Sequence, residues 1–163
     1  MQHCPNLKSI PYPSGEQTRG FTNLRMLDVE WCEALTSLPC EMIASCAASL
    51  ELLGLVGLSS LTNFAEVFRL VPKMPRLAHL GISAVPKFTY SPMEIGSFGS
   101  LRFLQVMPLL DSLDLASFEE FLDVLLQGVN SLPTLCLTGH QHWDSLPKQL
   151  QHDSHFSYSF KNN

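Results

Sequence analysis

Leucine and other aliphatic residues recur along this chain in the pattern Leu-x-x-Leu-x-Leu, whose last positions accept any aliphatic residue. The pattern begins at residues 24, 50, 77, 101 and 132, so successive copies are 26, 27, 24 and 31 residues apart. A second block, which ends in Ser-Leu-Pro or Ser-Ile-Pro, lies at 4–11 and 32–39 and returns in degraded form at 140–147. A recurring period of this length is typical of proteins built by stacking one small structural unit many times.

Each copy of the pattern predicts a short strand whose alternate aliphatic residues, such as Leu27 and Val29, face a shared core. One strand cannot bury that face alone, so the copies are expected to stack side by side in a parallel sheet. The block that ends in proline then turns the chain away from the sheet, because proline lacks the N–H that a strand would donate.

The segments between the strands carry apolar residues at helical spacing. Residues 63–71, followed by a proline, and residues 117–128, opened by a capping box, each predict a short helix. Residues 41–49 predict a third short helix, and residues 91–94 predict a single turn at most.

These elements define the expected fold class and domain organisation. The fold class is α/β: a curved leucine-rich-repeat solenoid of about five to six repeats, with a parallel β-sheet on the concave side and short helices and turns on the convex side. Residues 1–150 form this domain, and its first repeat is partial. Residues 151–163 are a divergent polar tail that is predicted to be disordered.

The composition agrees with a fold that buries leucine in quantity. The chain has 28 leucines in 163 residues, and charged residues make up 15% of it against about 25% in an ordinary soluble domain. The net charge of −5 and the pI near 5.6 do not provide the basic surface of a nucleic-acid or anionic-membrane binder, so neither partner is expected.

Targeting signals and cysteines indicate the compartment. No apolar stretch of about 18 residues is present to span a membrane, and residues 1–17 do not read as a signal peptide. The five cysteines are an odd number, and the chain has no Asn-x-Ser/Thr sequon. We therefore expect a cytoplasmic protein.

The blocks Cys-Pro-Asn-Leu-Lys-Ser-Ile-Pro at 4–11, Leu-Arg-Met-Leu-Asp-Val-Glu-Trp-Cys at 24–32 and Cys-Glu-Ala-Leu-Thr-Ser-Leu-Pro at 32–39 resemble a known family. They are similar to the C-terminal leucine-rich repeats of plant intracellular disease-resistance proteins of the coiled-coil, nucleotide-binding type (NLRs). The resemblance extends over residues 4–150. It implies a plant-defence protein whose repeats contact a pathogen effector or a guarded host protein and restrain the nucleotide-binding domain of a parent receptor.

The chain departs from that family in lacking the phosphate-binding motif Gly-x-x-x-x-Gly-Lys-Ser/Thr. The first repeat starts in mid-unit and the leucine pattern stops before residue 151, so we interpret the chain as a truncated repeat region. Two alternatives remain: the substrate-adaptor repeats of an F-box ubiquitin ligase, or a non-autonomous fragment of a decayed resistance gene.

The residues that alternate with the buried ones are expected to face the concave surface in three rows. The first row is Met26, Leu52, His79, Phe103 and Thr134; the second is Asp28, Gly54, Gly81, Gln105 and Cys136; the third is Glu30, Val56, Ser83, Met107 and Thr138. Methionine and aromatic side chains on such a surface favour a protein-binding face, although single exposed apolar residues are also ordinary. The candidate binding residues are Met26, Asp28, Glu30, Leu52, His79, Phe103, Gln105 and Met107.

The remaining candidate residues for binding, metal ligation or catalysis either have a structural explanation or lack a supporting motif. Residues 103–147 contain six acidic residues and no Lys or Arg, which suits either a basic partner or a solvated helix face. The histidines in 140–142 and 152–155 lack a second cluster of metal ligands, and Cys4 and Cys32 occupy positions where a small polar side chain bonds the turn backbone. With no catalytic motif, we expect neither an enzyme nor a cofactor.

Overall fold

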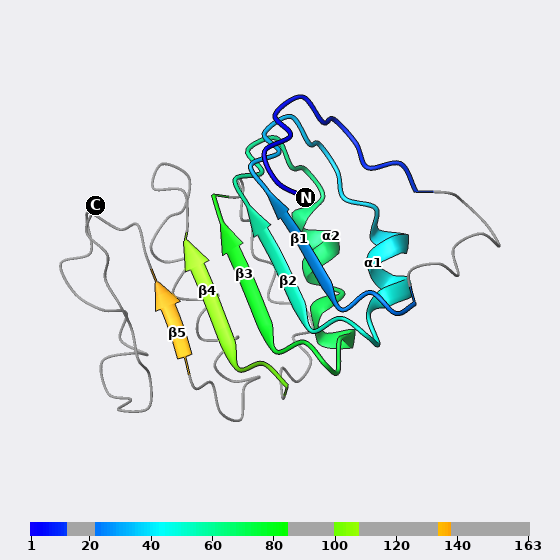
Figure 1. Cartoon of the computed structure of the whole chain (residues 1–163), viewed down its shortest axis with the longest axis vertical. Coiled ribbons are helices and arrows are strands. Elements are labelled where there is room, and N and C mark those ends of the chain that lie inside the picture. Colours follow the sequence, from blue (N-terminus) through cyan, green and yellow to red (C-terminus); the bar gives the residue numbers. More distant parts are fainter. Residues whose placement is uncertain (13–21, 85–99, 108–133, 138–163) are drawn as a thin grey trace.

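The computed structural model describes residues 1–12, 22–84, 100–107 and 134–137 of the chain. At its centre is a parallel sheet of five strands that lie side by side in the order of the sequence (Figure 1). The strands are β1 (Met26–Glu30), β2 (Leu52–Val56), β3 (His79–Ser83), β4 (Phe103–Met107) and β5 (Thr134–Leu137).

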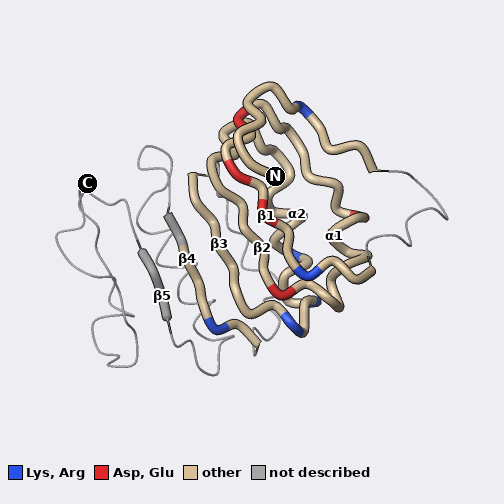
Figure 2. The backbone as a smooth tube through the Cα atoms, viewed as in Figure 1, with Lys and Arg blue, Asp and Glu red and all other residues tan. Residues whose placement is uncertain are grey.

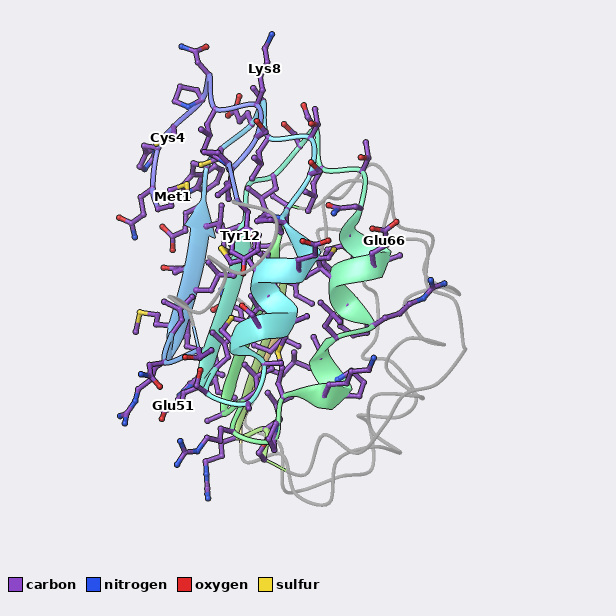
Figure 3. The ribbon with its side chains drawn as sticks, turned by 90° about the vertical axis from the view of Figure 1, so that its right-hand side faces the viewer. Met1, Cys4, Lys8, Tyr12, Glu51 and Glu66 are labelled. Carbon is purple, nitrogen blue, oxygen red and sulfur yellow. The ribbon has the colours of Figure 1, made fainter. Side chains whose placement is uncertain are left out.

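The described helices lie together on one face of the sheet (Figure 3). They are α1 (Cys40–Cys46), α2 (Phe64–Phe68) and the 3₁₀ helix η2 (Val71–Lys73). The structure is therefore α/β with a parallel sheet, as the sequence predicts.

Equivalent residues of successive strands lie directly opposite one another. Met26 pairs with Leu52, which pairs with His79, and the same row continues through Phe103 to Thr134. The strands keep this alignment although the units that connect them differ in length. The register predicted by the aliphatic pattern is confirmed across all five strands.

The sheet face toward the helices forms an apolar core. The second and third aliphatic residues of the first three units, together with Leu104, are at most 8% exposed, and the leucines that open the units at 50, 77 and 101 are at most 2% exposed. Burying each such side chain stabilises the fold by roughly 2 kcal/mol. The helices close the core from the other side with Met42, Ile43, Phe64 and Val67.

The helices differ in detail from the prediction. α1 forms within the expected segment but begins at Cys40 and ends at Cys46, three residues before the predicted end at residue 49. The predicted helix over 63–71 is divided, because α2 ends at Phe68 and η2 follows it. This tighter turn buries Val71 in the core. The elements predicted at 91–94 and 117–128 lie outside the described residues.

The residue that follows each of the first three strands has a left-handed backbone. Its φ is 54° at Trp31, 64° at Gly57 and 50° at Ala84, and His3 has a φ of 52° in the equivalent place beyond the Gln2–Glu30 bridge. The N–H of Trp31 donates to the carbonyl of Val56 at 2.8 Å, which joins this turn to the next unit. The first three strands therefore end in one repeated turn, and glycine is the residue that adopts it with least strain.

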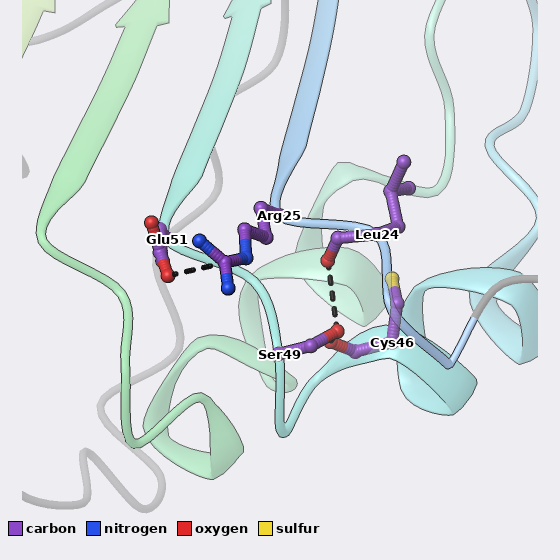
Figure 4. A network of polar contacts seen from close by, with 5 residues as sticks. All are labelled: Leu24, Arg25, Cys46, Ser49 and Glu51. Atoms are coloured by element: carbon purple, nitrogen blue, oxygen red, sulfur yellow. Dashed lines mark hydrogen bonds and ion pairs between the residues drawn. The ribbon is translucent and has the colours of Figure 1, made fainter.

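Serine hydroxyls join neighbouring units where the strands begin. Ser49 Oγ donates to the carbonyl of Leu24 at 2.8 Å (Figure 4), and Ser100 Oγ donates to that of Leu77 at 3.0 Å. Each serine directly precedes the first leucine of its unit, and each carbonyl belongs to the first leucine of the unit before. The same contact thus recurs along the stack.

A second series of contacts joins the turns beyond the strand ends. Thr36 Oγ1 donates to the carbonyl of Lys8 at 3.1 Å, and Thr62 Oγ1 donates to the carbonyl of Thr36 at 2.8 Å. The backbone N–H groups of both threonines donate to the same carbonyls. Three successive turns are connected in this way.

Asn63 provides the most complete link between turns. Its side chain accepts a hydrogen bond from the N–H of Leu38 at 3.0 Å and donates to the carbonyl of Leu38 at 2.8 Å. Asn63 stands at the start of α2, but its side chain makes no capping bond there. It satisfies the backbone of the preceding unit instead of its own helix.

Gly57 and Gly81 form a matched pair for testing the turn. Gly57 has a positive φ, and a Cβ there would lie 2.5 Å from Trp31 Cε3, whereas a Cβ at Gly81 would meet nothing closer than the Cα of Gly54 at 3.9 Å. We expect Gly57→Ala to lower the free energy of unfolding by about 1–3 kcal/mol. Gly81→Ala is expected to change it by less than about 0.5 kcal/mol. Urea unfolding followed by circular dichroism measures both, and equal effects of the two substitutions would contradict this account of the turn.

Asn63→Ala removes both bonds to Leu38 and is expected to cost about 2 kcal/mol, at roughly 1 kcal/mol for each hydrogen bond. Thr62→Ala is the control, because it removes one exposed contact from the neighbouring position. The same unfolding measurement applies. A loss for Asn63→Ala no larger than that for Thr62→Ala would show that the Asn63 link contributes little.

Candidate protein-binding face

The face of the sheet turned away from α1, α2 and η2 presents the alternate residues of each strand (Figure 3). In its first row Met26 is 59% exposed, His79 is exposed, and Leu52 and Phe103 are half-buried. The rings of His79 and Phe103 lie 5.9 Å apart at 40° to each other. The structure thus brings together four of the candidate residues as an apolar and aromatic row across β1–β4.

The second row runs from Asp28 through Gly54 and Gly81 to Gln105. The Asp28 carboxylate lies over Gly54, which is buried, while the position beside the Gly81 Cα is open. Asp28 and Gln105 are candidate binding residues in this row, and both are half-buried. The sequence pattern places both glycines in this row but not among the candidate binding residues, although their equivalent positions in successive strands would identify them.

The third row contains Glu30, Val56 and Ser83, followed in register by Met107. Glu30 and Val56 are half-buried, and Ser83 is 6% exposed. The backbone register places Met107 in the row as predicted. Thr138 lies outside the described residues.

The charged residues of this face are all acidic in the part of the rows that the structure describes. They are Asp28 and Glu30, both on β1. Basic residues lie instead where strands begin (Figure 2): Arg25 directly precedes β1, and Arg102 directly precedes β4. Arg25 Nε lies 3.8 Å from a carboxylate oxygen of Glu51, and both side chains are largely exposed, so this pair contributes little stability (Figure 4).

An aromatic stack borders the face beyond the end of β1. The rings of His3 and Trp31 are nearly parallel, at 14°, with centroids 6.3 Å apart. Trp31 also covers Gly57 and is still 43% exposed. Sequence reasoning did not select Trp31, although its position directly after a predicted strand marks it as a border residue.

The predicted turn role of two cysteines is confirmed. The thiol of Cys32 donates to the carbonyl of Glu30 at 3.5 Å, and that of Cys4 donates to the carbonyl of Gln2 at 3.6 Å. Each thiol thus bonds the residue two positions before it, at equivalent points of successive turns.

A polar cluster lies on the helix side, away from the rows. Cys40 Sγ is 3.8 Å from Glu66 Oε2 and 3.5 Å from Asn63 Nδ2. Burial, and then the negative charge of Glu66, raise the pKa of the Cys40 thiol above its usual value. The folded state therefore disfavours the thiolate form of Cys40. Its contribution to stability is present at pH values below the ordinary thiol pKa of 9.0 and is lost as the pH rises through the raised pKa of the folded state.

In the described ranges, no group of three or more His, Cys, Asp or Glu side chains is placed to hold a metal ion. The histidines in 140–142 and 152–155 and the acidic residues of 108–133 and 144 lie outside these ranges. None of the described helices is long and apolar enough to cross a membrane.

Comparison of the chain with protein-family models, with curated proteins and with solved structures finds no match.

Glu66→Gln tests the electrostatic part of the Cys40 environment. Removing the charge is expected to lower the pKa of the Cys40 thiol and to speed its alkylation by iodoacetamide near pH 8. Cys46 is the internal control, because burial alone raises its pKa and it does not depend on Glu66. Mass spectrometry of a timed reaction separates the two sites. An unchanged Cys40 rate in the folded variant would contradict the assigned role of Glu66.

Proposed function

We propose that this chain is a leucine-rich-repeat solenoid whose uncovered sheet face recognises another protein. The observation that carries the proposal is the row of Met26, Leu52, His79 and Phe103, aligned across four strands on the face that the described helices do not cover. Methionine and aromatic side chains adapt to a partner and supply much of the energy of protein interfaces.

The repeated turn and the contacts between units support the solenoid. Left-handed residues after successive strands, serine hydroxyls before them and threonine hydroxyls at the turns all recur at the period of the leucine pattern. An arrangement in which each unit contacts its neighbours through the same groups is the defining property of a repeat protein.

Binding is a better explanation of the face than catalysis. A nucleophile needs a base within hydrogen-bond reach, and the described side chains of the three rows contain no such pair. They offer instead a broad surface with apolar, acidic and uncovered backbone portions.

The resemblance of residues 4–11 and 24–39 to NLR repeats supports a setting in plant defence. In that setting the chain is cytoplasmic, and its partner is a pathogen effector, a guarded host protein or the nucleotide-binding domain of a parent receptor. All three are proteins, and each would be met by the same surface.

Selection of a random peptide library displayed on phage against the full chain tests the proposed face. We expect the enriched peptides to bind about tenfold more weakly to Leu52→Glu and Phe103→Glu, because these changes place charge in the apolar row. Ala44→Glu and Ala65→Glu are matched controls on exposed positions of α1 and α2 and should leave binding unchanged. Biolayer interferometry measures the affinities.

Circular dichroism of all four variants checks that each keeps its fold. Peptides that lose affinity only on the helix-side variants, or a selection that enriches nothing over an uncoated surface, would contradict the proposed function.

A further inference from the structure

The chemistry of the face indicates what kind of segment it accepts, an inference that rests on the proposed function. Gly81 lies in the middle of the second row, and the space where a side chain would stand is open. A glycine inside a strand often marks a place where a ligand or another backbone approaches closely. The sheet backbone is thus accessible between the first and third rows.

The β1 side of the face is acidic. The carboxylate of Asp28 lies over Gly54, and Glu30 follows two residues later on the same strand. Among the described residues no Lys or Arg side chain pairs with Asp28 or Glu30, and the N-terminal ammonium group of Met1 donates to the backbone carbonyl of Asp28 at 2.6 Å and not to either carboxylate. Two carboxylates at this end of the face favour a cationic group on the partner.

The β4 side of the face is aromatic. His79 and Phe103 form a tilted pair with centroids 5.9 Å apart, and Leu52 continues the same row toward β1. Aromatic and large aliphatic side chains pack well on such a pair. The two ends of the face thus differ in the side chain that each would accept.

The spacing of strands sets the distance between these two ends. Neighbouring strands are about 4.8 Å apart, so the three steps from β1 to β4 cover about 14 Å. An extended chain rises about 3.3 Å per residue, and about four residues therefore span this distance.

We propose that the face binds an extended protein segment lying across the strands, with an arginine over Asp28 and Glu30 and an aromatic or large aliphatic residue against His79 and Phe103, about four positions away. The backbone of the segment passes over Gly81. Arginine suits this site better than lysine, because its planar guanidinium pairs with carboxylates through two hydrogen bonds.

The peptides enriched in the selection on the full chain test this inference. Their aligned sequences are expected to contain Arg separated by about four residues from Phe, Tyr, Trp or Leu, in either order. A synthetic peptide of that consensus should bind about tenfold more tightly than the same peptide with Arg replaced by Glu. Enriched peptides without a basic residue would overturn the inference while leaving the proposed face intact.

Variants of the protein provide the second arm. Asp28→Asn with Glu30→Gln should weaken binding of the consensus peptide about tenfold, and the matched pair Glu41→Gln with Glu66→Gln, on the helix side, should not. Gly81→Val should weaken it by a similar factor by filling the open position, and circular dichroism checks that this variant keeps its fold.

Each result of the variant arm has a distinct meaning. Equal binding to the wild type and to the Asp28/Glu30 or Gly81 variants would overturn the inference. If Leu52→Glu and Phe103→Glu also had no effect, the proposed function itself would fail.

Discussion

A strand with aliphatic residues on one face is stable in this protein because a neighbour in the same register covers it. Leu27, Leu53 and Leu80 occupy one such line through the core, and each is buried by the units on either side. Register is therefore the constraint on which the rest depends. A slip of one residue would turn the leucines to solvent and bring the polar row inward.

The turns and hydroxyl contacts hold the units in that register although the connecting segments differ in length. A left-handed residue ends each of the first three strands at the same point, and the Ser49 contact with Leu24 recurs between Ser100 and Leu77. The described connections carry α1 between β1 and β2, and α2 with η2 between β2 and β3, while the strands keep one register.

That regularity gives the uncovered face its functional potential. Because equivalent positions align, residues more than twenty positions apart in the sequence become neighbours in one row, as His79 and Phe103 do. Substitutions at these positions change the surface without disturbing the core.

The sequence by itself predicted the parallel order of the strands, their register, and those buried leucines and row positions that the structure describes, because the aliphatic spacing within a unit favours the one register that buries its aliphatic side chains. It also predicted the turn role of Cys4 and Cys32. Only the tertiary structure decided that Asn63 bonds Leu38, that Trp31 covers Gly57 and that Asp28 lies over Gly54. These contacts join residues of different units, and their geometry depends on how the units stack, which local spacing does not specify.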